Sequence, residues 1–241
     1  LGSGDYKYTY AIPINGGFNL IENFTIDAPV GEAIHLSGDG NSFKKGYINN
    51  QCSDKKTIVL IEAPNSSFEN VSIIASGTNS YGISIEYASN NLQIKDVNIT
   101  AGRGIYSSSS KQIDNVTIEN VALTGYDTDY GIYLYNMKDV TINNTQISSF
   151  RRGITMSNYC DNIHIKNTNI YGFPSSGVSR GIECEECCVD KNIFIENVVV
   201  DASQGGTTGG IYLYTTDPSY LIENIAVINC SIYNTTSKGI Y

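Results

Sequence analysis

The chain has 241 residues, with 15 Lys and Arg against 24 Asp and Glu, so its formal net charge is −9. An acidic chain with no cluster of basic side chains lacks the electrostatic footprint of a nucleic-acid or lipid-surface binder. No apolar run approaches the roughly 20 residues that span a bilayer. We therefore expect no nucleic-acid partner and no membrane insertion.

The composition favours strands and tight turns. There are 33 Ile against 9 Leu, together with 26 Asn, 23 Gly and 18 Tyr, and β-branched and aromatic residues suit pleated surfaces while Gly and Asn suit turns. We expect one domain over residues 1–241, with a lead-in strand at 1–15 and repeating coils at 16–241. Because the first residue is Leu1 and no leader follows it, we expect a fragment of a longer chain.

Two sequence markers recur along the chain. Glycine followed by isoleucine begins a short alternating strand at Gly82, Gly104, Gly131, Gly153, Gly181, Gly210 and Gly239. A second marker, Asn or Asp before an aliphatic residue, falls at Asn23, Asn70, Asp96, Asn120, Asn144, Asn167, Asn197 and Asn229. Asn tolerates the left-handed backbone of a two-residue corner. Each unit of 22 to 29 residues is thus a coil that buries its apolar side chains against its neighbours.

This pattern predicts an all-β fold, a single-stranded right-handed parallel β-helix of about 8–9 coils with three short strands per coil. The Gly-Ile-Tyr-Leu unit at 131–134, the Asn-Thr-Gln-Ile unit at 144–147 and their copies resemble the repeats of the pectate-lyase-like superfamily. That resemblance covers nearly the whole chain. It implies the fold, and it implies a polysaccharide or cell-surface glycan as partner and an extracellular or cell-surface location. Members include polysaccharide lyases, glycoside hydrolases, epimerases, tailspikes and adhesin-like proteins.

The outward positions of the strand after each repeat glycine carry Tyr133, Tyr135, Tyr212 and Tyr214. Rows of tyrosine rings suit stacking on sugars. The alternative interpretation is that tyrosine is a good strand former whose cross-strand pairs stabilise the sheet.

Glu183 and Glu185 lie two residues apart on one strand face, which separates their Cα atoms by about 6.5 to 7 Å. We expect them to be the acid and base of any glycosidase chemistry. Arg152 and Arg180 fall in the column before the glycine and could bind an acidic glycan, or neutralise a uronate while a Tyr removes its proton. Alternatively, these Arg and Glu side chains are solvated surface partners.

Two departures from known enzymes argue against a specific activity. The three-Asp cluster and Arg-x-Lys segment of polygalacturonase-like hydrolases are missing, and so are the clustered carboxylates that bind calcium in pectate lyases. We therefore expect no cofactor and no metal site, with calcium as an alternative that no motif supports. Both histidines, His35 and His164, are expected at the surface without a catalytic partner.

Cys160 and Cys188 each lie seven residues after a repeat glycine, so they could form a disulfide across adjacent coils. Cys184 and Cys230 are expected in inward columns as buried thiols.

The sequence thus favours an extracellular carbohydrate-binding β-helix module which, if an enzyme, is a polysaccharide lyase or glycoside hydrolase. The alternative is a non-catalytic stalk or an adhesin or tailspike segment. Uncapped strand edges also allow end-to-end or trimeric self-association.

Overall fold

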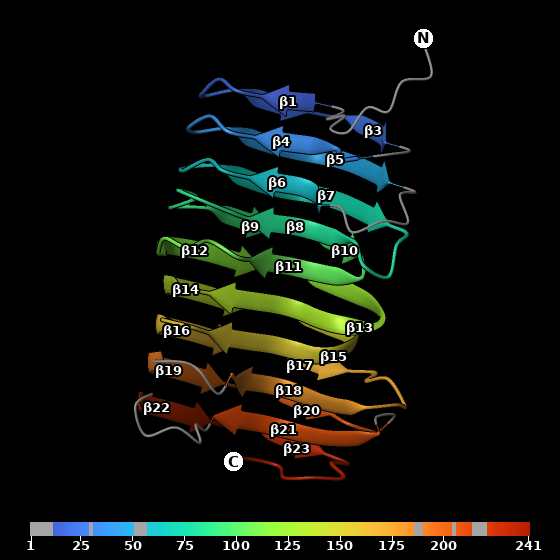
Figure 1. Ribbon diagram of the computed structural model, residues 1–241, viewed down its shortest axis with the longest axis vertical. Helices are drawn as coiled ribbons and strands as arrows, with labels where there is room; N and C mark the ends of the chain where they lie inside the picture. Colours follow the sequence, from blue (N-terminus) through green and yellow to red (C-terminus); the bar gives the residue numbers. More distant parts are fainter. Residues whose placement is uncertain (1–11, 29–30, 51–56, 186–189, 204–205, 214–220) are drawn as a thin grey trace.

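The computed structural model describes residues 12–28, 31–50, 57–185, 190–203, 206–213 and 221–241. In those residues it contains strands and no helix, and the paired strands run parallel. Figure 1 shows coils stacked in one column, from β1 near the N-terminus to β23 near the C-terminus. The expected right-handed parallel β-helix is confirmed. The described part includes no helix with the length and apolar character needed to cross a bilayer.

The strands form three ladders along the stack. The first ladder contains β1 (Ile12–Ile14), β4 (Ile34–Leu36), β6 (Thr57–Ile61), β8 (Tyr81–Ile85), β11 (Arg103–Ser107), the second part of β13 (Ala122–Tyr135) and of β15 (Gln146–Ser157), β18 (Val178–Cys184) and β21 (Thr207–Leu213). The second ladder contains β2 (Leu20–Glu22), the first part of β5 (Ser42–Asn50) and of β7 (Ser67–Ala75), β9 (Gln93–Lys95), β12 (Ile113–Glu119), β14 (Met137–Asn143), β16 (Asp161–Lys166), β19 (Asp190–Glu196) and β22 (Ile222–Ile228). The third ladder contains β3 (Thr25–Ala28), the remaining parts of β5, β7, β13 and β15, and then β10 (Asn98–Thr100), β17 (Asn169–Tyr171), β20 (Val199–Asp201) and β23 (Ser231–Tyr233).

Some coils have longer strands than the sequence predicts. Three short strands per coil were expected, yet β13 runs unbroken over Ala122–Tyr135 and pairs with β15 on both sides of a register shift between Thr124 and Thr128. Parallel pairing resumes at Thr128, opposite Phe150. The third and first ladders are therefore joined into one strand in β13 and in β15.

The core lies inside the coils, as the alternation predicts. The inward pairs after the repeat glycines are 0 to 4% exposed at Ile83, Ile85, Ile132, Leu134, Ile154, Met156, Ile182 and Cys184. Near the N-terminal end, Phe43 and Phe68 stack with ring centroids 4.8 Å apart. Identical or similar side chains therefore pack directly on one another from coil to coil, which removes their apolar surface from water.

The asparagine corners also follow the sequence. All eight marker residues have left-handed φ values, between 49° and 56°. A second left-handed column, not foreseen, turns the chain at Asn65, Asn91, Asn115, Asp139, Asn162, Asn192 and Asn224. Side-chain amides bond along these columns, as where Asn144 Nδ2 donates to Asn120 Oδ1 at 2.6 Å. Each corner is thus tied to the corner of a neighbouring coil.

The repeat glycines are required because the backbone passes close above them. A Cβ at Gly131 would lie 2.7 Å from the carbonyl oxygen of Gly153, and one at Gly153 would lie 2.5 Å from that of Gly181. Gly239, in the last coil, has no atom within 4 Å of the same position. The glycine column therefore lets successive coils approach to hydrogen-bonding distance.

We predict that Gly153→Ala lowers the free energy of unfolding by about 1–3 kcal/mol, because the methyl group meets a backbone carbonyl that cannot move without breaking the ladder. Urea unfolding measures the loss. Gly239→Ala is the matched control and should change stability little. Equal effects of both substitutions would contradict this explanation of the glycine column.

Candidate functional site

Aromatic and charged side chains gather on the outer face of the first ladder. We call this surface the Tyr–Glu face, and it consists of Tyr106, Tyr130, Tyr133, Tyr135, Arg152, Glu183 and Glu185. In-register pairing of β11, β13, β15 and β18 brings these residues together from four successive coils.

The tyrosine rings form a continuous row. Tyr106 and Tyr133 stack with centroids 4.9 Å apart and an interplanar angle of 12°. Tyr135 follows at 6.4 Å from Tyr133, nearly parallel to it, and Tyr130 lies 4.7 Å from Tyr133 with its ring tilted. Because adjacent parallel strands repeat at about 4.8 Å, tyrosines in one column stack face to face.

Glu185 is held by two tyrosine hydroxyls. Tyr133 Oη donates to Glu185 Oε2 at 3.2 Å, and Tyr130 Oη donates to Glu185 Oε1 at 3.3 Å. Tyr133 and Glu185 lie two coils apart, and in the columns of Tyr133 and Tyr135 the intervening coil has Thr155 and Ser157, both buried. The small side chains of the middle coil let the carboxylate and the phenols meet above them.

Glu183 is largely enclosed by its neighbours. The Glu183 side chain is 14% exposed. Its Oε1 forms an ion pair with Arg152 Nε at 2.6 Å and accepts a hydrogen bond from Thr155 Oγ1 at 3.2 Å. Burial raises the pKa of the Glu183 carboxyl, and the Arg152 guanidinium opposes that rise. Glu183 therefore holds Arg152 in place and also has the environment of a carboxylic acid that protonates more readily than usual.

The phenols of this face are weak acids. Burial raises the pKa of Tyr130 to about 12 and raises that of Tyr133 as well, with the nearby Glu185 carboxylate acting in the same direction. Both hydroxyls therefore stay protonated at neutral pH and donate hydrogen bonds.

The remaining predicted residues lie further along the stack. Arg180 covers the ring of Tyr212 at 4.0 Å, and the Tyr212 hydroxyl bonds Ser237 Oγ at 3.0 Å. Tyr212 is only 8% exposed, so its expected solvent exposure is wrong: Arg180 and Tyr241 cover it. Tyr214 lies outside the described residues.

Sequence reasoning missed Tyr130, which contacts both Glu185 and Arg152. Its hydroxyl bonds Glu185, and the Arg152 guanidinium lies 5.1 Å from its ring centroid. The available signal was its place directly before a repeat glycine, the position that Arg152 and Arg180 occupy in the following coils.

A buried carboxylate, Asp190, links two coils behind this face. It is 0% exposed, its Oδ1 accepts the Cys160 N–H at 3.0 Å, and it is hydrogen-bonded by the Cys184 side chain. Burial, the largest cause, raises its pKa to about 6.

The cysteines fit the sequence only in part. Cys184 is buried and Cys230 partly buried, as expected. The disulfide between Cys160 and Cys188 is not supported, since the described residues form no disulfide and Cys188 lies outside them. Instead, Cys160 Sγ lies 3.5 Å from the carbonyl oxygen of Ser157.

The two histidines are partly buried and have polar neighbours. His35 lies 3.4 Å from a Glu32 oxygen and 3.3 Å from a Glu62 oxygen. His164 lies on the second ladder, well separated along the coil from the Tyr–Glu face, and bonds Asn162 Oδ1 at 3.0 Å.

Comparison with known protein families identifies the repeats. The family model described as "Periplasmic copper-binding protein (NosD)" matches residues 17–226, most of the chain. The chain belongs to the NosD family. No curated protein matches it in sequence.

Solved structures of similar shape include two mannuronan C-5 epimerase A-modules from Azotobacter vinelandii. The AlgE6 module has a TM-score of 0.35 at 12% identity, over 93% of this chain and 90% of that one. The AlgE4 module has a TM-score of 0.35 at 13% identity, over 92% and 91%. The assignment to the NosD family does not depend on either similarity.

We predict that Asp190→Asn removes a pH-dependent part of the stability. With a folded-state pKa near 6 against an ordinary value of 3.8, the folded chain binds more protons than the unfolded chain between about pH 4 and 6. The free energy of unfolding should therefore fall as the pH rises through this interval, by up to about 3 kcal/mol.

Asn keeps the acceptor for the Cys160 N–H but does not ionise, so the variant should lose that slope and be more stable at pH 7. Urea unfolding at pH 4, 5, 6 and 7 measures both chains. An unchanged slope in the variant would show that the buried Asp190 carboxyl is not the group that titrates.

Proposed function

We propose that this chain is a β-helix module that binds a polysaccharide or cell-surface glycan along the Tyr–Glu face. The observation that carries the proposal is the Glu185 carboxylate fixed by two tyrosine hydroxyls beside a stacked row of half-buried rings. A flat aromatic row offers a stacking surface to the apolar faces of sugars, and a fixed carboxylate accepts hydrogen bonds from their hydroxyls.

The length of the face suits an extended chain molecule. Its tyrosines and acids come from four coils, so it spans about three inter-coil steps, roughly 15 Å. Preformed contacts between Tyr130, Tyr133 and Glu185 also mean that little side-chain entropy is lost on binding. We place this function outside the cytoplasm, in agreement with the periplasmic description of the family.

The family description also names copper. Copper sites use His, Cys and Met side chains in convergent groups. Among the residues that the structure describes, no group of three or more His, Cys, Asp or Glu is placed to hold a metal ion. These residues do not fit a copper centre, and no step of the proposed function uses one.

Cleavage of the bound glycan is a second candidate function, favoured by the raised pKa of Glu183. A carboxyl group that protonates readily is suited to act as a general acid, and Glu185, which accepts hydrogen bonds from Tyr130 and Tyr133, would be the base. Arg152, paired with Glu183, would meet an acidic substituent of the sugar. If neither binding nor cleavage occurs, the stalk, adhesin or tailspike alternative remains for this rod.

We predict that Glu185→Gln and Tyr135→Ala each weaken glycan binding at least tenfold, because each removes a contact worth about 1.4 kcal/mol or more. Calorimetric titration with a panel of acidic and neutral oligosaccharides measures the affinities. Tyr171→Ala, which removes a 42% exposed ring from the third ladder, is the control and should bind as the wild type does. Unchanged affinity in both test variants would reject the Tyr–Glu face.

For cleavage, the informative substitution is Glu183→Gln. The amide oxygen still accepts the Arg152 hydrogen bond, so binding should change less than about threefold while release of reducing ends or unsaturated uronates falls at least a hundredfold. A wild-type chain that binds the oligosaccharides but releases no product would leave binding alone as the function.

A further inference from the structure

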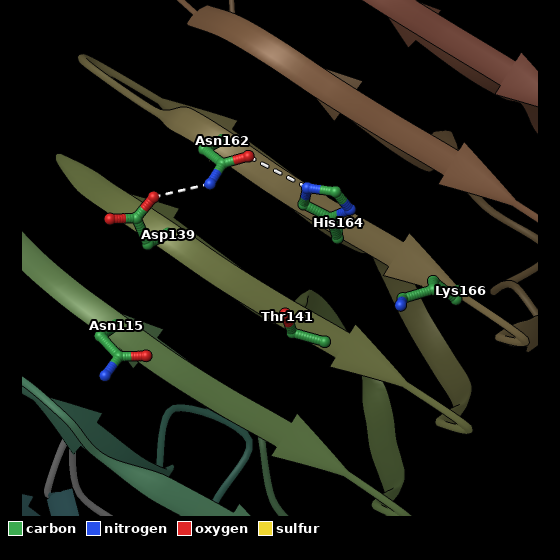
Figure 2. Close-up of a pocket in the computed structure, with 6 residues that line it drawn as sticks. All are labelled: Asn115, Asp139, Thr141, Asn162, His164 and Lys166. Atoms are coloured by element: carbon green, nitrogen blue, oxygen red, sulfur yellow. Dashed lines mark hydrogen bonds between the residues drawn. The ribbon is translucent and has the colours of Figure 1, made fainter.

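Apart from the Tyr–Glu face, the protein has a polar groove on the outer face of the second ladder. Figure 2 shows it across β12, β14 and β16. Its volume is about 600 Å³, and the residues that line it are Asn115, Asp139, Thr141, Asn162, His164 and Lys166. None of these belongs to the Tyr–Glu face.

The groove coincides with a break in a ladder of side-chain amides. At this corner, Asn91 Nδ2 donates to Asn65 Oδ1 and Asn115 Nδ2 donates to Asn91 Oδ1, both at 2.7 Å. The next residue in the column is Asp139, which accepts from Asn162 at 2.6 Å but has no N–H to give to Asn115. Asn115 Oδ1 and the second Asp139 oxygen are thus acceptors that receive no hydrogen bond from the described residues.

The His164 side chain, which lines the groove, is held in one orientation by its neighbours. Because Asn162 Nδ2 donates to Asp139, its Oδ1 faces His164 and accepts from Nε2 at 3.0 Å, as Figure 2 shows. The His164 ring also stacks on the exposed ring of Phe194, with centroids 4.7 Å apart. The hydrogen bond to Asp139 therefore fixes the Asn162 amide, and the amide in turn fixes the His164 imidazole against the Phe194 ring.

Lys166 supplies a positive charge at the end of the groove opposite Asn115 and Asp139. Lys44, Lys95 and Lys191 each form an ion pair with the in-register glutamate of an adjacent coil. Lys166 is in register with Glu196 in the same way, yet no ion pair joins them. Figure 2 shows its ammonium group turned back over the strands toward Thr141.

We propose that this groove binds a uronate unit of an acidic saccharide. The sugar carboxylate meets the Lys166 ammonium, the ring hydroxyls donate to Asn115 Oδ1 and the Asp139 carboxylate, and the sugar ring lies beside the His164–Phe194 stack. The acceptors and the cation lie at opposite ends of the groove, which matches a sugar with hydroxyls on one edge and a carboxylate on the other. This site is independent of the proposed function of the Tyr–Glu face.

The test is NMR titration of the full chain with a tetramer of galacturonic acid, with cellotetraose as the neutral probe. The acidic tetramer should shift the backbone amides of residues 139–141 and 162–166, and cellotetraose should shift them much less. Lys166→Met should weaken this binding at least tenfold. Lys191→Met is the matched control, since Lys191 is paired with Glu223, and should leave the affinity within twofold.

Asp139→Asn separates a binding role from a structural one. The new amide can donate to Asn115 Oδ1 and still accept from Asn162, so the melting temperature should rise while affinity for the acidic tetramer falls at least fivefold. Unchanged affinity in both Lys166→Met and Asp139→Asn would overturn the proposal. Shifts at residues 130–135 and 183–185 with none at 139–141 and 162–166 would also overturn it and leave the Tyr–Glu face intact, whereas the reverse pattern would reject the Tyr–Glu face and keep this groove.

Discussion

The structure depends on one constraint, the close parallel register between successive coils. Backbone hydrogen bonds join each strand to the same strand of the next coil, and the repeat glycines leave room for that approach. Asn residues with left-handed φ values turn the chain at the corners, so that each coil begins in register with the coil before it. Because the register is maintained, every outward position becomes a column, and any residue type repeated in the sequence becomes a row on the surface.

Those rows explain why both candidate sites are made of residues that are distant in the chain. Tyr133 and Glu185 are 52 residues apart and yet bond across one intervening coil, since Thr155 and Ser157 leave the space between them open. In the second ladder, replacement of Asn by Asp at one step of an amide column interrupts its hydrogen bonds and leaves acceptors exposed at position 139. Both candidate surfaces thus lie where a column departs from its own repeat.

The sequence was sufficient to predict the fold and the outward columns of the first ladder that carry Tyr133 and Glu185. Gly-Ile recurring every 22 to 29 residues and the left-handed Asn positions are local signals, and each has a direct backbone cause. Contacts between columns were less predictable. Tyr130 lies directly before a repeat glycine, and its contacts with Glu185 and Arg152 reach side chains of later coils that the repeat pattern does not specify. The cover that buries Tyr212 comes from side chains of two other coils, whose directions are set by packing rather than by periodicity.

The most direct test of this account is a double-mutant cycle between Tyr133→Phe and Glu185→Gln, with urea unfolding of the four chains. If stacking in register brings these residues into contact, their effects on the free energy of unfolding should be coupled by about 0.5–1.5 kcal/mol. Additive effects, with no coupling beyond experimental error, would mean that residues two coils apart do not meet on a common face.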